Sequence, residues 1–344
     1  MVVKRLDEMA WRNIGIIRSI KDEQFSRQIL EARRDFLALR LNHEPAIKQI
    51  YIDAGNEVAE RLRNITAGTP QLTKAHLTTL EKVLREQAEI MDTSIKTLMK
   101  SGVGKAASLE PKALDDYLIR AFKDAKAPLD FIKLQRGFAD INTSAVEAFW
   151  SRTRNGLTVS DRIWQQTQTA RQAMRDVLQA GLASGHDAVK VARDLEQYVK
   201  NGAKTLSENY PNMMARMGRR VPGDLSYETL RLVRTEYSNA FFEGTYSRGA
   251  VNPSYRGVQY MLSDAHPKPD ICDDLAEADL YGLGNGVYPE GEEPHLPHCN
   301  CLCYVVPVVI ERELFLSQIE GWLEDPSSQP ELEDWYNDVY RKMQ

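Results

Sequence analysis

The chain of 344 residues is long enough for two or three domains, and its 42% hydrophobic and 27% charged residues predict a soluble globular protein. No run of 18 apolar residues occurs, so we expect no transmembrane helix and no membrane partner. The N-terminal stretch MVVKRLDEMAWRNIG lacks the apolar region of a secretory signal. We therefore expect the protein to fold in a reducing cytoplasm, where free thiols or metal thiolates are commoner than disulfides.

Charge is distributed unevenly along the chain. The net charge of -5 combines residues 1–221, with 36 Lys and Arg against 27 Asp and Glu, and residues 222–344, with 8 against 22. The basic part can attract nucleic acid, whereas the acidic part repels phosphate. Alternatively, the long helices are simply rich in solvated Lys and Arg. The split indicates two regions with different partners.

The first two hundred residues have the apolar period of amphipathic helices. The helices predicted from this pattern span 22–41, 45–65, a stretch capped by Thr73, 116–124, 146–150, 159–182 and 186–199. The segment SGVGKAASLEPKAL (101–114) contains two glycines and is predicted to be a loop, with Ser108 as N-cap of the next helix. Thr158 or Ser160 caps the helix over 159–182, and Gly185 ends it.

The composition and the predicted type of element change after residue 200. A linker rich in Gly, Pro and Asn (201–229) contains a basic patch of Arg216, Arg219 and Arg220, which we consider a candidate nucleic-acid-binding site. The elements predicted beyond it are a helix over 226–250 with Ser226 as N-cap, a strand over 255–262, a Gly- and Pro-rich loop over 282–297, a β-rich run over 301–310 and an acidic tail with Trp322 and Trp335 on short helices.

These patterns predict a mainly α protein, with a long helical N-terminal region and a small C-terminal α+β domain that contains a Cys/His cluster. The expected segments are a helical region (1–155), a helical pair and linker (156–221), a compact α+β domain (222–310) and an acidic helical tail (311–344).

The four cysteines lie within 32 residues, at Cys272, Cys299, Cys301 and Cys303, with His298 directly before the last three. Zinc binds four Cys and His ligands in a tetrahedron. Three cysteines spaced two apart cannot all reach one metal from a straight strand, because each two-residue step spans about 6.6 Å. Either the backbone turns at Cys299 or one cysteine is a spare. The preferred ligand set is Cys272, Cys301 and Cys303, completed by His298 or Cys299.

Two other interpretations of the cluster stay open. The thiols can be unmetallated and buried on a core strand. They can also be catalytic, with His266, His295 or His298 as the base of a nucleophilic cysteine. A zinc nuclease of the His–Asn–His kind would use Asp264, His266, Asp270, His298 and Asn300.

A further enzymatic alternative uses the acidic run EGEEP (290–294) as the paired glutamates of an ADP-ribosyltransferase, with Arg234 as its arginine. Exposed acidic loops are far commoner than such sites. Arg234 and Glu236 lie on the predicted helix over 226–250, where a structural ion pair is the simpler role.

The order of these motifs resembles the phage head morphogenesis family, the Mu F-like minor head proteins of tailed phages. The matching residues are Arg234, Thr235 and Glu236 in its Arg-Thr-Glu helix, Asp264 and Cys272 in its middle element, and His298, Cys301 and Cys303 in its terminal His-x-x-Cys-x-Cys. The resemblance covers roughly 156–308. The departures are Leu275 for the second cysteine of a CxxC pair, Tyr260 for tryptophan, Leu302 for arginine, and Cys299 as an extra thiol.

The resemblance implies a virion component rather than an enzyme. It implies a low-copy minor capsid protein in the capsid interior or near the portal, assembled in the host cytoplasm and associated with genome packaging or ejection. The implied partners are the portal protein, the major capsid or scaffold proteins and double-stranded DNA bound without sequence preference. Zinc, where bound, would be structural.

Overall fold

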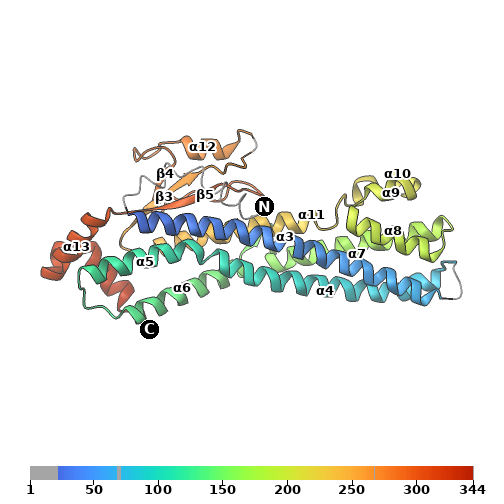
Figure 1. Cartoon of the computed structure of the whole chain (residues 1–344), viewed down its shortest axis with the longest axis horizontal. Helices are drawn as coiled ribbons and strands as arrows, with labels where there is room; N and C mark the ends of the chain where they lie inside the picture. Colours follow the sequence, from blue (N-terminus) through green and yellow to red (C-terminus); the bar gives the residue numbers. More distant parts are fainter. Residues whose placement is uncertain (1–21, 68–70, 267, 344) are drawn as a thin grey trace. The chain divides into compact units, whose positions relative to one another are not determined.

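The computed structural model describes residues 22–67, 71–266 and 268–343 and confirms a mainly helical chain with a small α+β part near the C-terminus (Figure 1). The helices are α3 (Glu23–Ile65), α4 (Lys74–Ala106), α5 (Leu109–Asp124), α6 (Phe131–Ser151), α7 (Val159–Ala183), α8 (Ala188–Asn201), α9 (Lys204–Asn209), α10 (Pro211–Met217), η1 (Gly218–Arg220), α11 (Tyr227–Gly249), α12 (Ile271–Glu277), α13 (Arg312–Glu324), η2 (Pro326–Ser328), α14 (Pro330–Trp335) and η3 (Tyr336–Tyr340). The strands are β1 (Thr153–Arg154), β2 (Leu157–Thr158), β3 (Tyr255–Met261), β4 (Val287–Pro289) and β5 (Tyr304–Val309). Among the described residues, no helix combines the length and the apolar character needed to cross a membrane.

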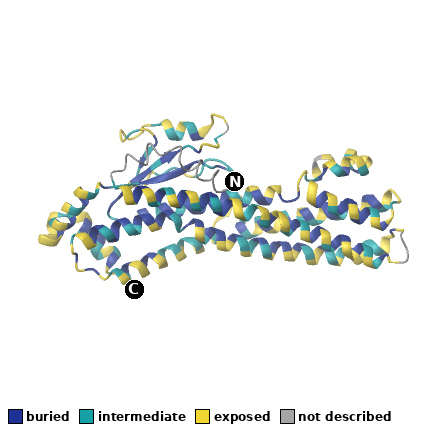
Figure 2. Ribbon diagram, viewed as in Figure 1, coloured by how far each residue is buried: buried dark blue, intermediate teal, exposed yellow. Residues whose placement is uncertain are grey.

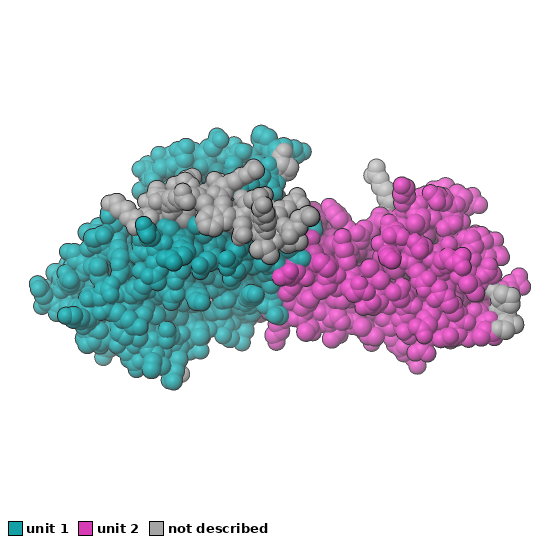
Figure 3. Space-filling view, in the orientation of Figure 1, with its two compact units in different colours: residues 1–41, 101–150, 234–344 teal, residues 42–100, 151–233 magenta. Residues whose placement is uncertain are grey.

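The chain forms two compact units, each built from separate stretches of sequence (Figure 3). Unit 1 comprises residues 1–41, 101–150 and 234–344, and unit 2 comprises residues 42–100 and 151–233. This division differs from the four consecutive segments expected from the sequence. The reason is that α3, α4 and α11 each contribute residues to both units.

Unit 2 is a helical bundle whose long helices bury one face and expose the other (Figure 2). Its fully buried side chains include Val58, Leu80, Met91, Ile163, Met174, Val177, Val191 and Leu195, which recur at helical spacing. The predicted N-cap of α7 is confirmed, since Thr158 and Asp161 form a reciprocal capping box. Gly185 follows α7 with φ of +67°, as its predicted helix-ending role requires.

Unit 1 has an aromatic core that joins its three sequence stretches. Phe36 of α3 contacts Phe241 of α11, with ring centroids 4.6 Å apart. Phe122 of α5 stacks on Trp335 at 5.1 Å and meets Trp322 edge-on at 6.3 Å. The acidic tail therefore packs into the core through its two tryptophans, in agreement with the short helices predicted around them.

The sheet of unit 1 has the order β4-β3-β5, with antiparallel pairing throughout. Met261 pairs with Tyr304, and the β3–β5 ladder extends from there to Tyr255 and Val309. The predicted strands are confirmed, but the second begins at Tyr304 rather than at Cys301. Cys301 and Cys303 therefore precede β5, where the backbone is free to turn.

The loop predicted over 101–114 is wrong. Helix α4 continues through Gly102 to Ala106, and α5 begins at Leu109. The glycine permits close packing rather than a break, because a Cβ at Gly102 would collide with the hydroxyl of Tyr237. Ser108 occupies the N-cap position, but its hydroxyl donates to the carbonyl of Lys105 at 2.9 Å and does not cap α5.

The two helices predicted on either side of residue 45 are one helix, α3, which contains Pro45 in its interior. Proline lacks the N–H that would bond the carbonyl of Leu41 four residues earlier. Leu41 is exposed, so water can satisfy that carbonyl. The helix therefore continues at the cost of one backbone hydrogen bond.

A carboxyl group is buried in the core of unit 1. The hydroxyl of Thr245 donates to Glu110 Oε2 at 2.6 Å, and the guanidinium of Arg33 favours the ionised form. Burial outweighs both effects and raises the pKa of Glu110 from 4.5 to about 8. The folded chain therefore holds a proton on Glu110 at neutral pH that the unfolded chain releases.

Glu110→Gln should remove this pH dependence of stability. Between pH 4.5 and about 8 the unfolded chain binds fewer protons than the folded chain. The unfolding free energy of the wild type therefore falls as pH rises, by at most about 1.4 kcal/mol per pH unit. We expect variant and wild type to have similar urea midpoints at pH 5 and the variant to have the higher midpoint at pH 9. Glu89→Gln, at an exposed site, is the control; equal shifts of Glu110→Gln at both pH values would contradict the assignment.

Candidate metal centre

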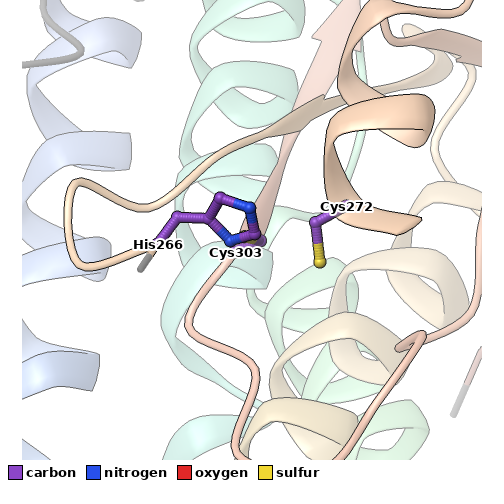
Figure 4. A group of neighbouring side chains, drawn as sticks. All are labelled: His266, Cys272 and Cys303. Atoms are coloured by element: carbon purple, nitrogen blue, oxygen red, sulfur yellow. The ribbon is translucent and has the colours of Figure 1, made fainter. Parts of the chain in front are cut away.

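The sheet topology gathers the Cys and His residues at one end of the sheet. Because β3 and β5 are antiparallel neighbours, the loop that leaves β3 and the loop that enters β5 meet beside Met261 and Tyr304. The first loop contains His266 and leads into α12, which carries Cys272 in its first turn. The second loop contains His298, Cys301 and Cys303. Figure 4 shows His266, Cys272 and Cys303 gathered around one point.

Three buried thiols form the centre of this cluster. The Sγ atoms of Cys272 and Cys301 lie 3.6 Å apart. Cys303 Sγ accepts a hydrogen bond from the backbone N–H of Ser263 at 3.5 Å. The hydroxyl of Tyr260, on β3, donates to Cys272 Sγ at 3.2 Å and lies 3.9 Å from Cys301 Sγ. All three thiols are at most 3% exposed, so they face one another rather than solvent.

Two imidazoles flank the thiols. His298 Nε2 lies 3.2 Å from Cys272 Sγ, and His266 Nδ1 lies 4.0 Å from Cys303 Sγ. Each ring is oriented through its other nitrogen: His298 Nδ1 donates to the carbonyl of Cys299 at 2.9 Å, and His266 Nε2 to the carboxylate of Asp273 at 2.8 Å. Such outer hydrogen bonds select the tautomer that presents a lone pair to a metal.

The cluster suits zinc. The donor atoms of Cys272, His298 and Cys301, and those of His266, Cys272 and Cys303, form two groups within 4.8 Å, and both groups share Cys272. Two thiolates that bind one zinc at about 2.3 Å in a tetrahedron lie about 3.8 Å apart. The Cys272–Cys301 distance of 3.6 Å is close to that value. Three thiolates and one of the two imidazoles would complete the four positions.

Two of the three thiols resist ionisation, because the pKa values of Cys272 and Cys303 are raised. Burial raises the pKa of Cys272 to about 12. The hydrogen bond between Cys301 and Cys303 lowers the pKa of Cys301 and raises the pKa of Cys303. Metal ligation requires thiolates, so binding must release protons and weaken as the pH falls. The hydrogen bond to Asp273 also raises the pKa of His266 and so favours its protonated ring. A metal bound to His266 must displace a proton from that ring too.

The loop that enters β5, which carries His298, Cys301 and Cys303, is held in place by hydrogen bonds to its backbone. Arg33 donates to the carbonyl of Leu302 at 2.5 Å, and Arg40 donates to the carbonyl of Cys301 at 3.2 Å. Ser238 Oγ donates to the same Cys301 carbonyl at 3.1 Å. The N–H of Asn300 donates to Thr235 Oγ1 at 3.1 Å, and Asn300 itself has φ of +62°. This left-handed residue supplies the turn that brings His298 and the last two cysteines to one side.

Sequence reasoning missed three residues of this arrangement. The sequence pointed to His266 as a catalytic base or a zinc-nuclease residue, but not as a ligand of a structural metal. Arg33 and Arg40 were not singled out, although they lie on the same face of α3 as the buried Phe36. Arginines placed at helical spacing on an apolar face are the signal that points to buried acceptors.

The other predicted site residues are distributed as follows. Cys299 is half-buried and belongs to neither donor group, and Asp264 is exposed in the loop after β3. Thr235 and Glu236 are buried, and Glu236 accepts a hydrogen bond from Asn239 at 3.4 Å. Arg216, on α10, and Arg220, on η1, are exposed in unit 2. Arg219 also belongs to η1, but its side chain lies outside the described residues.

Cys301→Ser should abolish zinc binding, whereas Cys299→Ser should retain it, because only Cys301 belongs to the donor groups. We expect elemental analysis of protein purified without a metal-affinity tag to find about one zinc per chain in the wild type and in Cys299→Ser. A thiol count before and after denaturation should show protected thiols in the same two proteins.

The two histidines provide the matched comparison. We expect His298→Ala to lose more zinc than His266→Ala, since His298 Nε2 lies closer to a thiol. Metal-free wild-type protein whose four thiols are all free after denaturation would contradict a metal centre and would favour unmetallated buried cysteines.

Comparison with known proteins found no relative of the chain. No family model, curated protein or solved structure matches the chain. The interpretation of the centre therefore rests on its own geometry and on the order of its motifs.

Proposed function

We propose that the chain is a minor head protein of a tailed phage, in which the Cys/His cluster is a structural zinc centre. The observation that supports this proposal is the meeting of separate motifs at one place. Cys272, His298, Cys301 and Cys303 come together, and Thr235 of the Arg-Thr-Glu helix binds the turn between them. These are the residues that the resemblance to phage head proteins singles out.

The chemistry of the donors favours a structural role over a catalytic one. Sites rich in cysteine that fill all four zinc positions with protein ligands hold a fold together, whereas catalytic sites leave a position for water or substrate. The thiols here are buried, two of them beside the hydroxyl of Tyr260, and five Cys and His donor atoms are available for four positions. A metal bound there would join the loop that leaves β3 to the loop that enters β5, and would stabilise a domain that has few strands.

The enzymatic alternatives have less support. The nuclease alternative uses Asp264, His266, Asp270, His298 and Asn300. His266 and Asp270 belong to one donor group, and Asp270 lies 3.3 Å from His298 Nε2. Asp264, however, is exposed and belongs to none of the donor groups found among the described residues. In the acidic run over 290–294, Glu292 and Glu293 accept hydrogen bonds from the hydroxyls of Tyr281 and Tyr255. These bonds suit a structural loop better than a transferase site.

The charge distribution is compatible with a role inside the head. The proposed partners are the portal and capsid or scaffold proteins, together with packaged duplex DNA. Arg216 and Arg220 are exposed in unit 2, where they can contact phosphates without reading sequence. Carboxylates predominate after residue 221, which leaves protein partners for that part of the chain.

The proposal predicts that purified phage particles made from the genome carrying this gene contain the chain in low copy. Quantitative mass spectrometry of the particles measures this directly. Cys301→Ser should lower its incorporation, because loss of the centre unfolds the loops of unit 1, whereas Cys299→Ser should be incorporated normally. Infectious particles that form in normal numbers without the chain would contradict the proposal.

A separate prediction concerns DNA. Purified chain should retain duplex DNA at low ionic strength and release it as salt rises. The triple variant Arg216→Ala, Arg219→Ala and Arg220→Ala should reduce the slope of log affinity against log salt by about one per lost phosphate contact. Arg341→Ala with Lys342→Ala, at exposed basic residues of unit 1, is the control. If the wild type shows no salt-dependent retention, the DNA part of the proposal fails while the metal centre is unaffected.

A further inference from the structure

An apolar groove of about 360 Å³ follows β5 in unit 1. Gln259, Val287 and Val306 lie on one face of the sheet because Gln259 pairs with both valines, and all three line the groove. Leu283 lines its rim. In the order β4-β3-β5, β5 is an edge strand of the described sheet, so the groove lies at a border that no further strand of that sheet occupies.

The chain beside this groove is strongly acidic. Between Pro269 and Ile310 the sequence has eight Asp and Glu residues and no Lys or Arg. Asp279 is adjacent to the rim, since its carboxylate accepts a hydrogen bond from the N–H of Gly284 at 3.1 Å. Arg312 also lines the groove, but it forms ion pairs with Asp22 and Asp124 and does not offset this excess.

Two loops of this acidic segment flank β4, residues 278–286 and residues 290–303, and together they are called the acidic loop here. The first of them exposes large apolar side chains. Leu280 is 69% exposed and Leu283 is 54% exposed, with Tyr281 between them. The loop is nevertheless held in one shape: the N–H of Gly286 donates to the carbonyl of Ala278 at 2.8 Å, and the hydroxyl of Tyr281 donates to Glu292 at 3.2 Å. One exposed leucine needs no explanation, but apolar side chains gathered beside a groove on an ordered loop are typical of a binding surface.

Charge selects the kind of partner. The carboxylates repel the phosphates of nucleic acids and of anionic lipids, and they attract Lys and Arg. Pro307 lacks a backbone N–H, so addition of a further strand to β5 is disfavoured and side-chain burial is the expected mode of contact. We propose that the groove and the acidic loop bind a segment of a partner protein in which Lys or Arg flank aliphatic side chains. The proposal rests on the head-assembly function above and specifies the chemistry of the partner contact.

The test uses the purified full-length chain and fluorescent synthetic peptides. The probe is a short amphipathic peptide of lysine and leucine; matched peptides carry glutamate for lysine or serine for leucine. We expect the Lys/Leu peptide alone to bind, with an affinity that falls as salt rises. Leu283→Ser with Val287→Thr should weaken binding by roughly tenfold or more. Leu314→Ser, at an equally exposed leucine on α13, should leave the affinity unchanged, and circular dichroism verifies that each variant folds.

Four results would overturn the proposal. The first is unchanged affinity in the groove variant, and the second is equal binding of the Lys/Ser peptide, which would reduce the surface to unspecific charge. The third is a dimer that the groove variant abolishes, which would make the occupant a second copy. The fourth is a large gain in peptide affinity on deleting residues 1–21, which have five Lys and Arg against two Asp and Glu and would then be the occupant. Zinc content and presence in virions are measured separately, so failure of this proposal is distinguishable from failure of the proposed function.

Discussion

The shape of the cysteine loop depends on two guanidinium groups buried beneath it. Arg33 and Arg40 are 4% and 6% exposed. Burying such charges is costly unless hydrogen-bond acceptors of the protein take the place of water. The carbonyls of Leu302 and Cys301 are those acceptors, and the ring of Tyr304 lies 4.2 Å from the Arg33 guanidinium. The loop therefore takes its ligand-presenting conformation only when α3 is packed against it. Burial lowers the pKa of Arg33, while the neighbouring Glu110 acts in the opposite direction.

The candidate metal centre and the two arginines contact different parts of this loop. The arginines bind its carbonyls, whereas its thiols and imidazole face away toward α12 and the loop after β3. Without a cation, burial keeps the Cys272 thiol protonated and its cost low. With zinc, the same burial strengthens the bond to thiolate, because water cannot compete. Asp273, Tyr260 and the carbonyl of Cys299 orient the donors in advance.

Strand β5 connects this centre to the proposed docking groove. The residues directly before the strand are candidate ligands, and the residues within it line the groove. Helix α12 and the loop after it are involved too: Cys272, in the first turn of α12, belongs to the candidate centre, and Asp279 and Leu283 follow on the acidic loop. A metal that fixes the ends of these segments would also fix the spacing between the groove and its acidic rim. Structural metal binding and partner recognition would thus share one rigid element.

Local sequence patterns determined much of this protein. Apolar spacing predicted most of the long helices, although it missed residues 131–145 of α6. Thr158 and Gly185 marked the ends of α7, alternation marked β3, and a β-rich run marked β5. The clustering of cysteines beside His298 predicted a group of thiol and imidazole donors, and the structure brings such donors together. These signals are local because a helix or strand depends on neighbours a few residues away.

Tertiary structure alone decided the rest. Gly102 was misinterpreted as a loop residue because its role is to admit Tyr237, which lies more than a hundred residues away. The proximity of His266 to the buried thiols, and the absence of Cys299 from the donor groups of the described residues, follow from the register of β3 and β5 and from the turn at Asn300. The burial of Arg33 and Arg40 against a loop some 260 residues later, and the groove along β5, likewise arise from packing between distant segments. Such contacts leave no periodic trace in the sequence, because each partner alone resembles an ordinary surface or core residue.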